Sequence, residues 1–121
     1  MRYISLIKAV EGKFGPPPPA LMQAIGAFGL EGVLVDTAGI GPTSSGTLIR
    51  VARGKVSVSD GPFAADEEVA SGYAIFEAAT REDAVAFAKG FMDLHAKYWP
   101  EWQGVSEVRP VFGPSQATNT C

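Results

Sequence analysis

Two stretches with helical spacing of apolar residues interrupt a series of short strands, and this order leaves few topologies open to the chain. The strand candidates have alternating or uniformly apolar patterns and cover residues 3–10, 33–35, 47–53, 55–59, 73–78 and 105–111. The chain is thus expected to run β-α-β, a hairpin turning at Gly54, and β-α-β. This repeated pattern predicts an α+β fold: a ferredoxin-like sandwich with an antiparallel sheet and helices on one side.

The second helical stretch is the clearer one. Thr80 begins it, with Asp83 three residues later in a pattern that resembles a capping box. One stripe recurs at spacings of three and four and contains Ala84, Phe87, Ala88, Phe91, His95 and Tyr98. The helix is expected to end before Pro100.

The first helical stretch is weaker. It starts near Pro19 and runs to about Gly32. Gly26 and Gly29 lie inside it, and each costs about 1 kcal/mol relative to alanine. We expect this helix to depend on packing, with its glycines allowing a close approach to the sheet or to a neighbour.

Composition narrows the class of protein. The chain has 121 residues, which suits one domain with a single core. The formal charge of −3 offers no basic stripe, which disfavours nucleic-acid binding. The apolar stretch near the N-terminus is too short for a signal or a membrane span. The only cysteine is Cys121, which predicts no internal disulfide and a cytoplasmic protein without membrane partners.

The open face of the predicted sheet is expected to be apolar. Ile4, Leu6, Ile75 and Val108 are the residues assigned to it. An apolar face without a helix over it needs a partner, so the sequence predicts a homodimer.

Several short motifs follow one another along the chain. They are Gly32-Val33-Leu34, Gly39-Ile40-Gly41-Pro42, Arg50, Asp60-Gly61-Pro62-Phe63, Gly72-Tyr73, Glu82-Asp83-Ala84 and Glu107-Val108-Arg109-Pro110. In this order they resemble the YCII-related family, in the branch named for its DGPF motif. The resemblance implies a domain over residues 1–112, a flexible tail over 113–121, and a dimeric α+β barrel with a cleft between sheet and helices.

The chain departs from the family at the first helix. Some YCII-type relatives use a histidine there, paired with an aspartate, but residues 21–30 contain no histidine and no acid or base. Asp36 lies near where the aspartate would fall. The His-Asp chemistry therefore does not carry over to this chain.

His95 and Asp60 are the candidate catalytic residues. His95 is the only histidine, and its ordinary pKa suits proton transfer near neutrality. The alternative is a histidine at the edge of the core, hydrogen-bonded to a carbonyl or carboxylate. Asp60 opens a turn and faces the cleft as a base or a salt-bridge partner, or its side chain holds its own backbone in an Asx-type turn.

Arg50, Arg109 and Tyr73 are the candidate ligand-binding residues. Each arginine either pairs with a carboxylate in a structural network or binds an anionic group of a ligand, to which Tyr73 would add a hydroxyl. Trp99 and Trp102 are expected to cap the pocket or pack at the dimer edge; the alternative is that they stack on a substrate. A single histidine without a cysteine pair predicts no metal site, and no cofactor is expected.

Two functions remain open from the sequence. The first is a homodimer with a cleft for a small anionic or aromatic molecule, with general acid/base chemistry of an isomerase or lyase type. The second is a non-catalytic accessory or regulatory protein. Genes of the DGPF branch often neighbour those of extracytoplasmic-function sigma factors, which suggests the second role by association only.

Overall fold

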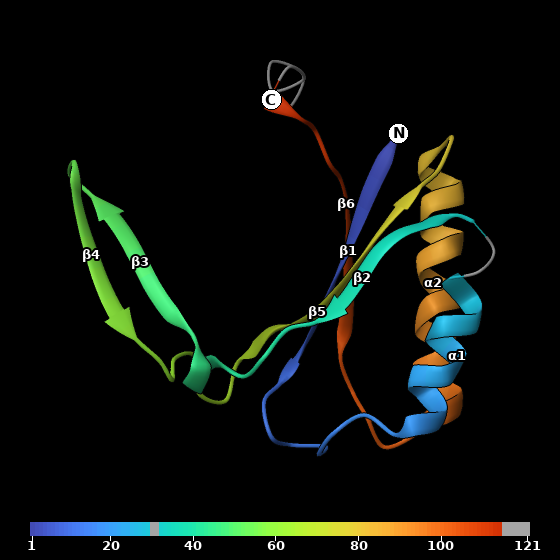
Figure 1. The fold of residues 1–121 in the computed structure, drawn as a ribbon, viewed down its shortest axis with the longest axis horizontal. Helices are drawn as coiled ribbons and strands as arrows, with labels where there is room; N and C mark the ends of the chain where they lie inside the picture. The colour runs from blue at the N-terminus through green and yellow to red at the C-terminus, as the bar shows by residue number, and fades with distance from the viewer. Residues whose placement is uncertain (30–31, 115–121) are drawn as a thin grey trace.

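The structure is a computed structural model and describes residues 1–29 and 32–114. Its elements are β1 (Arg2–Val10), α1 (Pro19–Gly29), β2 (Leu34–Gly39), the 3₁₀ helix η1 (Thr43–Ser45), β3 (Thr47–Ala52), β4 (Lys55–Asp60), β5 (Glu68–Glu77), α2 (Arg81–Tyr98) and β6 (Val105–Pro110). Among these residues, an antiparallel four-stranded sheet has the order β2-β5-β1-β6. Both helices lie on one side of it (Figure 1). The predicted ferredoxin-like α+β fold is confirmed.

The core lies between the sheet and the helices. Along β1, Tyr3, Ser5, Ile7 and Ala9 are buried, and the residues between them are half-buried. Phe76 of β5 is fully buried, and its ring lies 4.5 Å from that of Phe87 on α2. The buried residues of β1 thus meet the helical stripe of α2 in two clusters, one around Tyr3 and Phe76 and the other around Ile7 and Phe91.

Local signals set the ends of α2. The Thr80 side chain accepts a hydrogen bond from the Asp83 amide at 3.1 Å, which confirms the predicted cap. The helix ends at Tyr98, before Pro100. In α1 the helix stops at Gly29, and a Cβ there would lie 3.0 Å from the Leu34 side chain. Gly29 therefore provides the close approach expected of a helix glycine, whereas a Cβ on Gly26 meets nothing within 4 Å.

Two strands are longer than the sequence predicts. β2 continues to Gly39, beyond the expected strand of residues 33–35. β5 begins at Glu68, ahead of the expected strand of residues 73–78. In both cases the neighbouring strand supplies the pairing: Gly39 lies opposite Gly72, and Glu68 lies opposite Val10. Backbone pairing extends these strands through residues whose side chains are exposed or polar.

The β3–β4 hairpin matches the prediction closely. Its turn is Arg53-Gly54, with φ of 54° and 76°, so both residues occupy the left-handed region that a tight two-residue hairpin turn requires. In the described part of the chain, these two strands form a sheet of their own. Figure 1 shows the hairpin standing away from the four-stranded sheet and the helices.

The open face of the four-stranded sheet is less apolar than predicted. Val108 does not lie on it: this residue packs against the core cluster of Tyr3 and Phe76, on the helix side. The prediction failed because the pairing register sets Val108 opposite the buried Ser5, and sets Arg109 and Glu107 opposite Ile4 and Leu6 on the open face. Ile4, Leu6 and Ile75 remain there, each half-buried.

Charged side chains border those aliphatic residues. Lys8 donates a hydrogen bond to Glu107 at 2.8 Å, and Arg2 donates one to Glu77 at 2.9 Å. The open face is therefore a small apolar centre with ion pairs around it.

Candidate functional site

A cavity of about 450 Å³ opens between the helices, the sheet and the loop that follows β1. Its walls come from β1, α1, the end of β2, the first half of β5 and the end of α2. Gly12, Phe14, Gly15 and Pro17 contribute from the loop. Leu21 on α1 is 1% exposed and forms part of the apolar wall. Such a volume suits a small organic molecule.

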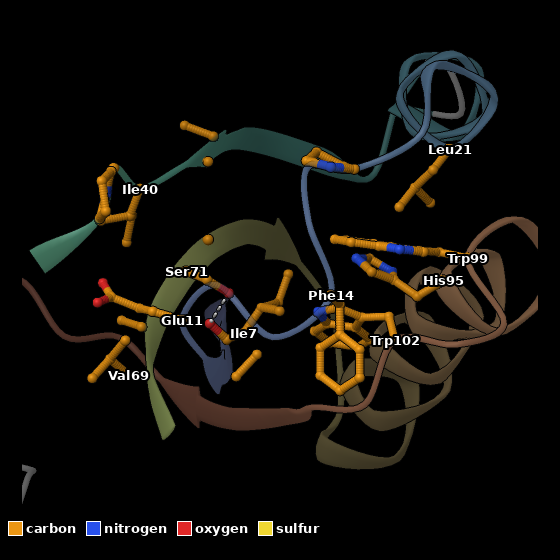
Figure 2. A pocket seen from close by; sticks show the side chains of 18 of the residues that line it. Ile7, Glu11, Phe14, Leu21, Ile40, Val69, Ser71, His95, Trp99 and Trp102 are labelled. Atoms are coloured by element: carbon orange, nitrogen blue, oxygen red, sulfur yellow. Dashed lines mark hydrogen bonds between the residues drawn. The ribbon is translucent and has the colours of Figure 1, made fainter. Parts of the chain in front are cut away.

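Aromatic rings gather where α2 ends. The His95 ring lies 5.6 Å from that of Phe91 and 5.0 Å from that of Trp102. Trp99 and Trp102 are stacked, with centroids 5.8 Å apart. Figure 2 shows the His95 and Trp99 rings side by side, with Ser71 and Glu11 toward the other end of the cavity in this view. All four aromatic side chains of this group line the cavity, so a flat ligand would meet ring faces there.

Helix geometry fixes the state of His95. Its Nδ1 lies 3.2 Å from the carbonyl oxygen of Phe91, one turn earlier in α2. A carbonyl only accepts, so Nδ1 carries the proton and Nε2 presents a lone pair in the neutral ring. Burial lowers the pKa of His95 below its usual value, with the bond to Phe91 opposing the shift. The imidazole is therefore neutral at pH 7.

The Nε2 atom of His95 is free to meet a ligand. It has no hydrogen-bond partner among the described residues. In the same part of the chain, no fully buried side-chain nitrogen or oxygen lacks a partner. Nε2 is therefore accessible. Because His95 lines the cavity, a ligand in the cavity can reach this atom. The site offers a hydrogen-bond acceptor within an aromatic wall.

Other polar groups of the cavity are already engaged. The Ser71 hydroxyl donates to the Ile7 carbonyl at 3.2 Å. Glu11 accepts hydrogen bonds from the backbone and the hydroxyl of Thr43, the latter at 2.8 Å. Apart from His95 and Glu11, none of the described residues on the wall is ionisable, and none is lysine or arginine. The cavity therefore lacks a cation that would hold an anionic group.

Of the five predicted site residues, the structure places His95 alone on the cavity wall. Arg50 lies on the exposed hairpin strand β3. Arg109 is on the open face of the sheet, with its guanidinium 3.5 Å from Glu107, which is one of the carboxylates expected to pair with it. The structure does not bring these residues together with His95.

Tyr73 also lies on the open face, where its hydroxyl donates to Asp36 at 2.8 Å. This bond, together with partial burial and the charge of Asp36, raises the pKa of Tyr73 above its ordinary value. Asp36, the residue nearest in sequence to the expected acid of a His-Asp pair, is thus engaged by a tyrosine across the sheet from His95.

Asp60 belongs to a structural junction at the base of the hairpin. Its carboxylate accepts a hydrogen bond from the Thr47 hydroxyl at 3.1 Å, across the two strands. The Gly61 amide donates to the Gly46 carbonyl at 2.8 Å, and the Phe63 amide donates to the Thr43 hydroxyl at 3.3 Å. The Gly61-Pro62 bond is cis. The DGPF motif therefore joins the hairpin to η1, in place of the Asx-type turn or the cleft-facing base that the sequence left open.

Glu11, Phe14 and Ser71 line the cavity but were missed by sequence reasoning. Phe14 stands between glycines and prolines, where no periodicity indicates a buried face. Ser71 follows a register shift between Ile7 and Lys8, which reverses the side-chain alternation along β5. Strand pairing determines which face of β5 each side chain occupies, and this pairing cannot be read from the sequence of one strand alone. Trp99 and Trp102 are on the wall, consistent with the expected pocket cap.

The described ranges contain no group of three or more histidine, cysteine, aspartate or glutamate residues that could hold a metal ion. Cys121 and most of the predicted tail, 113–121, lie outside the described residues. No helix in the part of the chain that the structure describes has the length and apolar character needed to cross a membrane.

Comparison with protein families gives one match: the model of the YCII-related domain covers residues 1–112. A comparison with functionally curated proteins finds none that matches.

Proposed function

This chain belongs to the YCII-related domain family, and we propose that it binds a small planar aromatic molecule in the cavity beside His95. The observation that carries the proposal is the accessible Nε2 acceptor of a neutral histidine among Phe91, Trp99 and Trp102. Aromatic walls favour a flat ligand, and the acceptor favours a ligand with an O–H or N–H group.

The ligand is neutral rather than anionic in this proposal. The only ionised side chain on the described wall is the carboxylate of Glu11, and it would repel an anion. The sequence left open an anionic or an aromatic ligand, and the cavity favours the aromatic one.

The same geometry supports acid/base chemistry. A neutral His95 has a lone pair at Nε2 that takes a proton from a ligand O–H, N–H or activated C–H, while the Phe91 carbonyl stabilises the imidazolium through Nδ1. One such group suits an isomerisation, in which the imidazolium returns the proton to another atom of the ligand. It also suits an elimination, in which the electrons of the broken C–H bond form a double bond and a leaving group departs with its own bonding electrons. In this proposal His95 is the acid/base, and Asp60 has no part in the chemistry.

We further propose that the protein is a homodimer. Ile4, Leu6 and Ile75 form an apolar centre on a sheet face that neither described helix covers, and the ion pairs around it give a polar rim. A central apolar patch with a polar rim is the usual anatomy of a protein interface. Two such faces in contact would give the α+β barrel that the family resemblance implies.

Isothermal titration calorimetry with indole and 1-methylindole tests the cavity proposal. Indole is flat and has one N–H donor, which methylation removes. We expect indole to bind, and 1-methylindole to bind about 10-fold more weakly, because one hydrogen bond contributes about 0.5–1.5 kcal/mol. In His95→Leu, which keeps an apolar wall of similar volume, the two probes should bind equally.

Two results would count against the proposal. If indole fails to bind the wild-type protein, the cavity does not take flat aromatic molecules. If the preference for indole persists in His95→Leu, the acceptor is another group.

A further inference from the structure

The β3–β4 hairpin has an apolar face that nothing in the described chain covers. Strand pairing sets Ile49 opposite Val58 and Val51 opposite Val56, so these four side chains stand on one face. They are 66–69% exposed. The opposite face is more polar, with Leu48, Arg50 and Ala52 opposite Ser59, Ser57 and Lys55. Alternation of this kind is typical of a strand pair with one side packed on another surface.

The hairpin makes no extensive contact with any other described element. It is attached at its base, where Asp60 and Gly61 meet Thr47 and Gly46. Figure 1 shows both strands projecting away from the sheet. A two-stranded hairpin without a packing partner is marginally stable in water, so its apolar face needs one.

Charge favours a second copy of this chain as that partner. The hairpin, residues 47–60, carries Arg50, Arg53 and Lys55 against Asp60 alone. Of the chain's 10 basic and 13 acidic residues, this leaves 7 basic and 12 acidic for the rest of the molecule. A hairpin of charge +2 therefore approaches a body of charge −5 when it lies on another copy.

Area supports the same partner. A free aliphatic side chain exposes on the order of 100 Å² of apolar surface, so the four residues at two-thirds exposure offer roughly 270 Å². In a two-fold dimer each copy contributes one arm and one surface that receives the arm of its partner. The two arm faces and the two receiving surfaces together bury roughly 1,100 Å². A specific interface needs about 1,000 Å². The arms alone reach this size only if they are exchanged.

We propose that the β3–β4 hairpin is an exchanged arm, whose face formed by Ile49, Val51, Val56 and Val58 packs on the body of a second copy. The arm rests on the proposed homodimer and adds to it, because the open sheet face and the hairpin are separate surfaces. The DGPF junction fixes the direction in which the arm leaves its own body.

Sedimentation velocity of Val56→Glu and Ser57→Glu tests the arm. The two substitutions add the same charge at neighbouring positions of β4, but Val56 is on the apolar face and Ser57 is on the other face. Neither side chain is in the core, and circular dichroism checks that both variants fold. We expect a wild-type dimer at micromolar concentration. Val56→Glu should weaken it about 100-fold or more, because an unpaired charge is buried twice, and Ser57→Glu should change it less than about 3-fold.

Hydrogen exchange gives a second readout on the wild-type protein. Amides of residues 47–60 should be protected above the dimer's dissociation midpoint and exchange freely below it. A dimer that is indifferent to Val56→Glu would overturn the arm and leave dimerisation through the sheet face intact. A wild-type monomer would overturn both, and protection of the hairpin that does not depend on concentration would overturn the arm.

Discussion

A Gly61→Ala substitution is expected to lower the free energy of unfolding by about 3 kcal/mol, because the new methyl group has no room. A Cβ on Gly61 would lie 1.7 Å from the carbonyl oxygen of Thr43 and 2.8 Å from its carbonyl carbon. Both are backbone atoms, so relief requires the η1 turn and the hairpin base to separate. That movement breaks the 2.8 Å hydrogen bond from the Gly61 amide to Gly46.

Gly26→Ala is the matched control. The same methyl group is added inside α1, where it meets nothing within 4 Å. Removing a glycine from an exposed helix position should raise the free energy of unfolding by about 1 kcal/mol. Urea denaturation of both variants measures the difference. If Gly61→Ala lies within about 1 kcal/mol of the wild type, the tight junction described for the DGPF motif is wrong.

A Trp99→Leu substitution is expected to weaken indole binding by about 10-fold or more, because stacking on an aromatic face contributes about 1–3 kcal/mol to the binding of a flat ring. Trp99 is 8% exposed and lines the cavity beside His95. The leucine keeps the wall apolar but removes the ring face and part of the enclosure.

Tyr98→Leu provides the comparison. Tyr98 is the preceding residue on α2 and is also aromatic, but it does not line the cavity. Calorimetric titration should give indole affinities for Tyr98→Leu within about 2-fold of the wild type. Equal losses in the two variants would indicate a general loosening of the helix end, and no loss in Trp99→Leu would exclude the tryptophan from the binding surface.

Local signals were sufficient to predict much of the fold. The Thr80 cap, the apolar stripe of α2 and the turn at Gly54 each depend on residues close together in the chain, and each is present in the structure. The order of these elements then leads to the ferredoxin-like arrangement. The end of β2 and the start of β5 were not predicted, because pairing with a neighbouring strand, rather than their own residues, extends them.

The candidate site was harder to predict because it depends on which face of a strand each residue occupies. Tyr73 is on β5, which lines the cavity, and Arg109 is on β6, but both lie on the open side of the sheet. Arg50 and Asp60 belong to a hairpin that leaves the body, which no pattern in its own sequence reveals. His95 was found because it is the one histidine of the chain and the stripe of α2 carries it to the core side, where it meets the cavity.

The DGPF motif has a different role from that expected of a conspicuous polar turn. The Thr43 hydroxyl accepts a hydrogen bond from the Phe63 amide and donates one to Glu11 on the cavity wall. One threonine thus connects the hairpin base to the cavity rim. We therefore expect a substitution in the motif to alter the structure of the cavity rim as well as that of the hairpin.

Nitrogen NMR of the imidazole of His95 tests the central claim most directly, since the chain has a single histidine and gives one pair of ring signals. The account predicts a neutral ring at pH 7 with the proton on Nδ1, a pKa below the ordinary 6.5 because of burial, and a shift of the Nε2 signal on addition of indole but not of 1-methylindole. Since the unfolded chain takes up this proton at higher pH than the folded one, stability should fall as pH drops from 6.5 toward the folded pKa. A proton on Nε2, or an Nε2 signal that does not respond to indole, would contradict the proposed site.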